Sequence, residues 1–170
     1  MANLAHLAAW LGRARPAARV SLIFPATPLG TMDAGPLAAC FAARLHLARF
    51  PSATTGLGSV DAAALAALDD PPRRFADVFR AVARDERMRG HAMTDVQLAA
   101  HLRALADGPT PLVRLDGEEV AITRTGRAVR DGARDRLDAQ RLDWWLGGVR
   151  LEGQRVRWRW DEAAQRIVAT

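Results

Sequence analysis

The chain has no lysine, no tyrosine and a single cysteine among its 170 residues. One cysteine cannot form an intrachain disulfide framework, and it is compatible with a reducing compartment. No apolar run approaches the ~20 residues that a membrane-spanning helix needs, and the first ten residues lack the basic start of a secretory signal peptide. These absences argue against a disulfide-rich or membrane-spanning class, and we expect a bacterial cytoplasmic protein with no membrane partner.

The composition is that of a folded, arginine-rich domain. Hydrophobic residues make up 49% and charged residues 25%, which is typical of a globular rather than a disordered chain. All 24 basic residues are arginine, and the formal net charge is +5. Residues 124–160 hold ten arginines against five acidic residues, whereas residues 1–123 hold thirteen against twelve. The positive field of this later part attracts phosphates or acidic surfaces without identifying a ligand.

The first part of the chain predicts a helix, a strand and a second helix. Leucines at helical spacing indicate a helix over Asn3–Arg13, and the apolar run Val20–Phe24 indicates a short buried strand. A second helix is expected from Gly35 or Pro36 to Arg49. Because a single strand needs partners, we interpret residues 1–52 as a possible remnant of an α/β domain or as a segment that pairs with the C-terminal hairpin.

The middle of the chain predicts three helices. Ser59 and Thr94 are residue types that cap helix N-termini, and each precedes or begins a run with apolar residues at helical spacing. The expected helices span residues 59–68, 73–85 and 94–107.

A hairpin and a last helix are expected next. Asp116-Gly117 lies between two short apolar runs, which predicts a type I′ turn. Thr123 or Thr125 is expected to cap a final helix that ends at Arg130. Three helices, a hairpin and a closing helix are typical of a winged-helix domain, which we place at residues 53–134.

The stretch Leu142–Asp161 holds four of the five tryptophans and predicts a β-hairpin. We expect a turn at residues 152–154 and a return strand over Val156–Trp160. Alternation in that strand puts Val156, Trp158 and Trp160 on one face and three arginines on the other. The tryptophan face is interpreted as core, although stacking on nucleotide bases stays open.

The whole chain is therefore expected to be an α+β protein, predominantly helical. It would have a winged-helix-like core and a C-terminal Trp/Arg β-hairpin, residues 135–170, that packs on this core. No internal repeat is visible.

No set of residues predicts catalysis, a cofactor or a metal ion. None of the four histidines has the spacing of a zinc site. Asp69-Asp70 precede two prolines and are interpreted as turn residues. Gly147-Gly148 lack the strand–loop–helix context of a phosphate-binding loop, so we expect a bulge or a close approach of backbone there. Whether the chain is an enzyme, and its oligomeric state, stay open.

Nucleic acid is one possible partner, with residues 94–107 as the recognition helix. The outward positions of this helix form a poor surface for reading bases, because only Arg103 is a firm cation; they are Asp95, Gln97, Ala100, His101 and Arg103. The candidate contacts to phosphates or to an acidic partner are Arg103, Arg114, Arg124, Arg127, Arg130, Arg155, Arg157 and Arg159. The alternative is that these arginines form a solvated face.

Several motifs together resemble a family of uncharacterised bacterial proteins, the domain of unknown function 1835. The family's pattern is L-T-x-x-G-R-x-V-x-x-G, then W-L-G-G-V-x-L, then W-R-W-D. The stretches that match are Ile122–Gly132, Trp145–Leu151 and Trp158–Asp161, with further similarity at residues 50–52, 56–57 and 108–116. The resemblance begins near residue 20.

The resemblance implies an N-terminal α/β domain that is mostly absent from this chain. The family has no established reaction, so it sharpens the expected architecture more than the function. Two hypotheses follow. The chain is a noncatalytic binding module for DNA or a protein partner, or it is an accessory or remnant domain of an enzyme whose catalytic half is missing.

Overall fold

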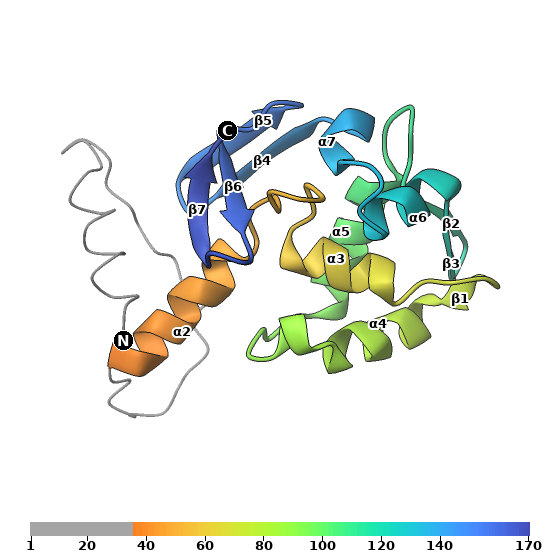
Figure 1. Cartoon of the computed structure of the whole chain (residues 1–170). Coiled ribbons are helices and arrows are strands. Elements are labelled where there is room, and N and C mark those ends of the chain that lie inside the picture. Colours follow the sequence, from red (N-terminus) through yellow and green to blue (C-terminus); the bar gives the residue numbers. More distant parts are fainter. Residues whose placement is uncertain (1–35) are drawn as a thin grey trace.

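The structure is a computed structural model that describes residues 36–170, and the side chains of residues 42–170 (Figure 1). The described residues contain both helices and strands, which confirms the α+β class. The helix expected at residues 3–13 and the strand expected at residues 20–24 lie outside the described part. None of the described helices combines the length and apolar character needed to cross a membrane.

The helices come mostly before the strands. The helical elements are α2 (Pro36–Leu47), α3 (Ser59–Ala66), α4 (Phe75–Arg84), the 3-10 turn η1 (Glu86–Met88), α5 (Asp95–Ala106), α6 (Arg124–Arg130) and α7 (Arg136–Ala139). The strands are β1 (Arg73–Arg74), β2 (Val113–Asp116), β3 (Glu119–Ile122), β4 (Leu142–Leu146), β5 (Val149–Gly153), β6 (Trp158–Asp161) and β7 (Arg166–Ala169).

Residues 57–132 form what we call the helical unit. Helices α3, α4 and α5 surround one hydrophobic cluster, into which α4 directs Val78 and Val82 and α5 directs leucines three and four residues apart. A three-stranded antiparallel sheet of order β1–β3–β2 closes one end (Figure 1). In the chain, β1 lies between α3 and α4, while β2 and β3 follow α5.

Two of the expected helix caps are confirmed and one is wrong. Thr94 forms a capping box with Gln97, and the Thr123 hydroxyl accepts from the Gly126 amide at 2.9 Å. Ser59 does not cap α3. Gly58 occupies the N-cap position without a side-chain hydrogen bond, and the Ser59 hydroxyl has no hydrogen-bond partner.

Two boundaries near the sheet differ from expectation. Arg73 and Arg74 do not begin a helix, because they pair with Val120 and Glu119 as strand β1. The turn of the β2–β3 hairpin consists of Gly117-Glu118 rather than Asp116-Gly117, since Asp116 pairs with Glu119. Only Gly117 has positive φ (+55°) there, so the turn is not of type I′.

The C-terminal stretch forms two hairpins, so the single hairpin expected from the sequence is wrong. Strands β4 and β5 are joined by Gly147-Gly148, both with positive φ, which is what a type I′ turn requires. The expected bulge is therefore a turn, although a close approach does occur, because a Cβ on Gly147 would lie 2.5 Å from His46 Nε2. Glu152 and Gly153 are the last residues of β5, so the expected turn at residues 152–154 does not form, and β6 pairs with β7 instead.

The prediction that the tryptophan face is core is confirmed. Val156 and Trp160 are buried, and Trp158 is partly buried against the same second hydrophobic cluster. This cluster also contains Phe50, from the segment after α2, and β6 exchanges backbone hydrogen bonds with residues 51 and 53. We call residues 43–56 and 135–170, without α7, the hairpin unit.

Burial predicts which tryptophan matters for stability. Trp160 is 4% exposed, so Trp160→Ala should lower the free energy of unfolding by about 3–5 kcal/mol. Trp145 is 70% exposed, and Trp145→Ala should change it by no more than about 0.5 kcal/mol. Chemical denaturation of both variants checks this, and equal effects would contradict the assignment of faces.

Candidate functional site: cationic surfaces and a buried charge cluster

The predicted arginines do not form one surface. Arg103 lies on α5, Arg114 on β2 and Arg124 at the start of α6, and all three are exposed. Within residues 42–170 these three side chains form no ion pair. Of the arginines predicted to contact phosphates or an acidic partner, these three are the ones in the helical unit that remain available.

Arg127 and Arg130 have structural partners. Arg127 donates to Asp70 at 2.7 Å, and Arg130 donates to the Leu68 carbonyl at 2.8 Å and to Asp69 at 3.0 Å. These contacts fasten α6 to the loop after α3. Asp69 and Asp70, which the sequence predicts as turn residues, therefore also bind α6 through their carboxylates.

The arginines of the predicted hairpin face also separate. Arg155 and Arg157 are exposed, and the Arg157 guanidinium lies 4.9 Å from the centre of the Trp158 ring. Arg159 is only 13% exposed and donates to Asp135 at 2.6 Å. The expected row of three cations therefore contains two exposed members.

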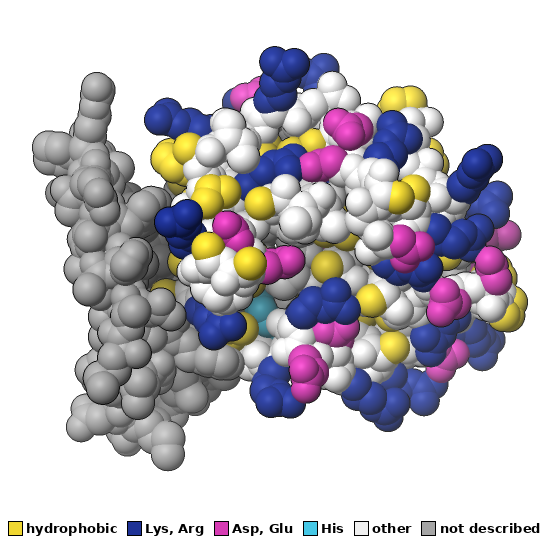
Figure 2. Space-filling view, viewed as in Figure 1, with side chains coloured by type: hydrophobic (Ala, Val, Ile, Leu, Met, Phe, Trp, Pro, Cys, Tyr) yellow, Lys and Arg dark blue, Asp and Glu magenta, His cyan; other side chains and the backbone are white. Residues whose placement is uncertain are grey.

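Figure 2 shows basic and acidic side chains interleaved over the visible face, with no continuous basic field. The ion pairs of the described residues include Arg74 with Glu118 at 3.6 Å and Arg150 with Asp143 at 3.0 Å. Such exposed pairs contribute little to stability, but they cancel the field that would draw in a polyanion.

The most unusual charges are buried between the two units. Asp61 on α3 is 1% exposed, and its two carboxylate oxygens bind different partners. Oδ1 lies 2.7 Å from Nδ1 of His101 on α5. Oδ2 accepts from the guanidinium of Arg136 on α7, which is 4% exposed. One carboxylate thus joins three helices.

Asp61 is held in its charged form. Burial raises the pKa of this carboxyl, but the positive charge of Arg136 and the hydrogen bond from His101 outweigh burial. The pKa of Asp61 therefore lies below its ordinary value. A buried carboxylate that is fully paired in this way stabilises one arrangement of its three helices.

The sequence predicts His101 as an outward residue of α5, and this prediction is wrong. Its imidazole is 15% exposed and packs edge-on against Trp144 of β4, with ring centres 5.8 Å apart and an angle of 80°. The chain therefore uses His101 to contact both Asp61 and the first C-terminal hairpin.

Sequence reasoning missed this cluster. Its one local signal is that Asp61 is the only charged residue of the helix SVDAAALA. A lone carboxylate among alanines suggests a distant partner, but those partners lie 40 and 75 residues further along the chain.

Helix α7 adds a second polar connection. The side-chain amide of Gln140, just after α7, donates through Nε2 to the carbonyls of Leu105 at 3.0 Å and Asp107 at 2.8 Å. These carbonyls lie at the C-terminal end of α5, where helical acceptors have no partner within the helix. Gln140 thus caps α5 from outside.

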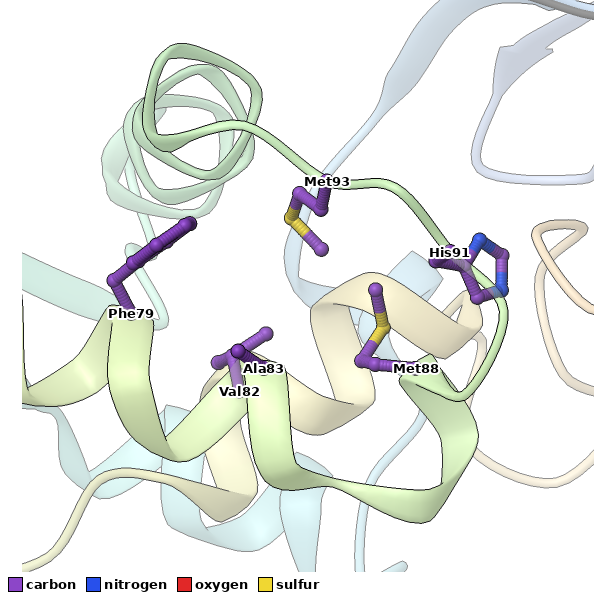
Figure 3. A pocket seen from close by; sticks show the side chains of 6 residues that line it. All are labelled: Phe79, Val82, Ala83, Met88, His91 and Met93. Atoms are coloured by element: carbon purple, nitrogen blue, oxygen red, sulfur yellow. The ribbon is translucent and has the colours of Figure 1, made fainter. Parts of the chain in front are cut away.

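A small apolar cavity of about 60 Å³ lies between α4, η1 and the loop before α5 (Figure 3). It is lined by Phe79, Val82, Ala83, Met88, His91 and Met93. Burial, with a smaller effect from the charge of Arg49, lowers the pKa of His91 and of His46. The cavity is smaller than the ~300 Å³ typical of a ligand pocket. Among the side chains of residues 42–170, no three metal-binding groups lie together.

Comparisons with known proteins identify no relative. No protein-family profile, curated protein or solved structure matches the chain.

The buried pair predicts a clear double-mutant cycle. Arg136→Met leaves Asp61 without its main compensating charge and should lower the free energy of unfolding by about 3–5 kcal/mol. Asp61→Leu combined with Arg136→Met removes both charges and should restore most of that loss. Denaturant melts of Asp61→Leu, of Arg136→Met and of the double variant measure this. If the loss in the double variant equals the sum of the two single losses, the two charges are not coupled.

Acid should weaken this connection. Because the pKa of Asp61 is lower in the folded protein than its ordinary 3.8, its contribution is complete above that value and is lost as pH falls through the folded pKa. The stability of the wild type relative to Asp61→Leu/Arg136→Met should therefore fall as the pH drops below about 5. Parallel pH curves for the two proteins would contradict a lowered pKa.

Proposed function

We propose that this protein is a noncatalytic binding module built on a winged-helix-like domain, predominantly helical, that recognises a protein partner. The support for the domain type is the element order α3, β1, α4, α5, β2, β3 and the sheet order β1–β3–β2. A winged helix presents its third helix and its hairpin to a partner. In this chain these elements are α5 and β2–β3.

Charge argues against DNA as the partner of these two elements. The exposed charged residues on α5, its C-cap and the β2–β3 hairpin comprise five carboxylates and two arginines. They are Asp95, Arg103, Asp107, Arg114, Asp116, Glu118 and Glu119. A duplex would meet net negative charge at the positions where phosphate binding needs cations.

Exposed apolar side chains on the same two elements favour a protein partner, and this is the observation that carries the proposal. Val96 on α5 is 71% exposed, and Leu115 on β2 is 41% exposed. Large apolar side chains exposed among carboxylates suit a partner that combines apolar anchors with a basic rim. Resemblance to the domain of unknown function 1835 is part of the same proposal, supported by the matched stretches of β4–β6.

The test places a photo-crosslinking amino acid at position 96 or 115 in cells. Crosslinks to one and the same protein are expected from both positions and should be lost when the other residue becomes Glu. A matched probe at Arg84, exposed on α4, should not give that product. Absence of a shared product from positions 96 and 115 would contradict the proposal.

DNA binding is the competing outcome, and it has its own measurement. Duplex binding at low salt should be weak and should not depend on the exposed residues Arg103, Arg114 and Arg124. A salt-sensitive gel shift that disappears when these three become Ala would overturn the protein-partner proposal. Arg127 and Arg130 are unsuitable for this test, because replacing them also releases α6 from Asp69 and Asp70.

A further inference from the structure

The chain crosses between the two units twice, and the two crossings lie side by side. The first crossing is residues 55–58, and the second is residues 133–135. The Arg136 amide donates to the Thr55 carbonyl at 2.8 Å. Gly56 has φ +69°, and a Cβ there would lie 2.2 Å from Asp135. In the sequence, the helical unit is thus inserted into the hairpin unit, and the two connecting segments lie next to each other.

Close packing of elements occurs within each unit. Helix α3 packs against α4, α5 and α6, while β4 packs against β5 and β6 against β7. Among the described elements, none of these closely packed pairs joins one unit to the other. The two hydrophobic clusters are also separate. Units joined in this way are expected to move relative to each other unless a large apolar interface holds them.

Beside the first crossing, the Ser59 amide donates to the Ala48 carbonyl at 2.9 Å. Away from the crossings, helix α7 makes the main connection. Leu137 belongs to the cluster of the hairpin unit, and Ala139 belongs to the cluster of the helical unit. Its first residue, Arg136, binds Asp61, and Gln140 after its end binds the last carbonyls of α5. Figure 1 shows α7 between the β4–β5 hairpin and the helices.

We propose that the two units open and close about the paired crossings, with α7 as the latch and the Asp61–Arg136 ion pair as its main contact. Asp135 remains bound to Arg159 of β6, so α7 moves with the hairpin unit. Opening withdraws Arg136, Ala139 and Gln140 from the helical unit. It also separates Trp144 from His101.

When the two units close, the hairpin unit and α7 contact α5 directly. In the closed state Gln140 caps the C-terminal end of α5, and Trp144 packs against His101 on the same helix. In the open state both supports are lost, so the surface that α5 presents becomes less ordered. The device does not depend on which partner α5 binds, and its test needs no partner.

Hydrogen exchange measured by mass spectrometry on the full chain tests the latch. In the wild type, amides of residues 135–141 should exchange at least about tenfold faster than those of β3 and β6, because opening exposes the single turn of α7, whose hydrogen bonds then fray before global unfolding. Arg136→Met should accelerate exchange at 135–141 by at least about tenfold more than in the two cores. Tryptic cleavage after the exposed Arg134 should accelerate in parallel.

The matched control is Arg127→Met, which removes an ion pair inside the helical unit and should leave exchange at 135–141 unchanged. Where Arg136→Met does not fold, Gln140→Ala keeps the ion pair, removes the cap of α5 and should give the same local acceleration. Exchange at 135–141 as slow as in both cores of the wild type, or one uniform acceleration across the chain in the variants, would overturn the latch.

Discussion

Asp61 is the constraint on which the rest of the structure depends. Its carboxylate lies almost entirely out of solvent, in the first turn of an alanine-rich helix, and it is compensated only when α5 and α7 are in place. Removing a carboxylate from water costs several kcal/mol unless charges and hydrogen bonds replace the water. The helical unit can therefore bury α3 fully only together with Arg136, which arrives 75 residues later in the chain.

The features predicted from the sequence are those decided within a few residues. Thr94 and Thr123 cap helices through contacts three residues away, and Val156 and Trp160 alternate inward along the chain. From the sequence we place the hairpin turn at residues 152–154 and expect a bulge or a close approach of backbone at Gly147-Gly148. Both glycines have positive φ and form the turn between β4 and β5, so the expected turn at residues 152–154 is wrong.

The parts that could not be predicted depend on contacts between distant residues. The sequence position of His101 predicts an outward residue, yet its side chain contacts Asp61 and Trp144 between the two units. Arg127, Arg130 and Arg159 look like members of cationic faces, yet each is paired with a carboxylate from another part of the chain. Arginine counts therefore overestimate the cationic surface, since no local pattern shows which guanidinium has a partner.

An ion pair between the two units fixes their relative position more strictly than an apolar contact would. Replacing a buried ion pair by well-packed apolar side chains is often neutral or stabilising, so Asp61–Arg136 is not needed for stability as such. An ion pair, however, is satisfied only in a narrow geometry, whereas apolar side chains tolerate sliding. The pair therefore defines one closed position of the two units. Because both groups regain water when they separate, the junction can open without exposing a large apolar interface.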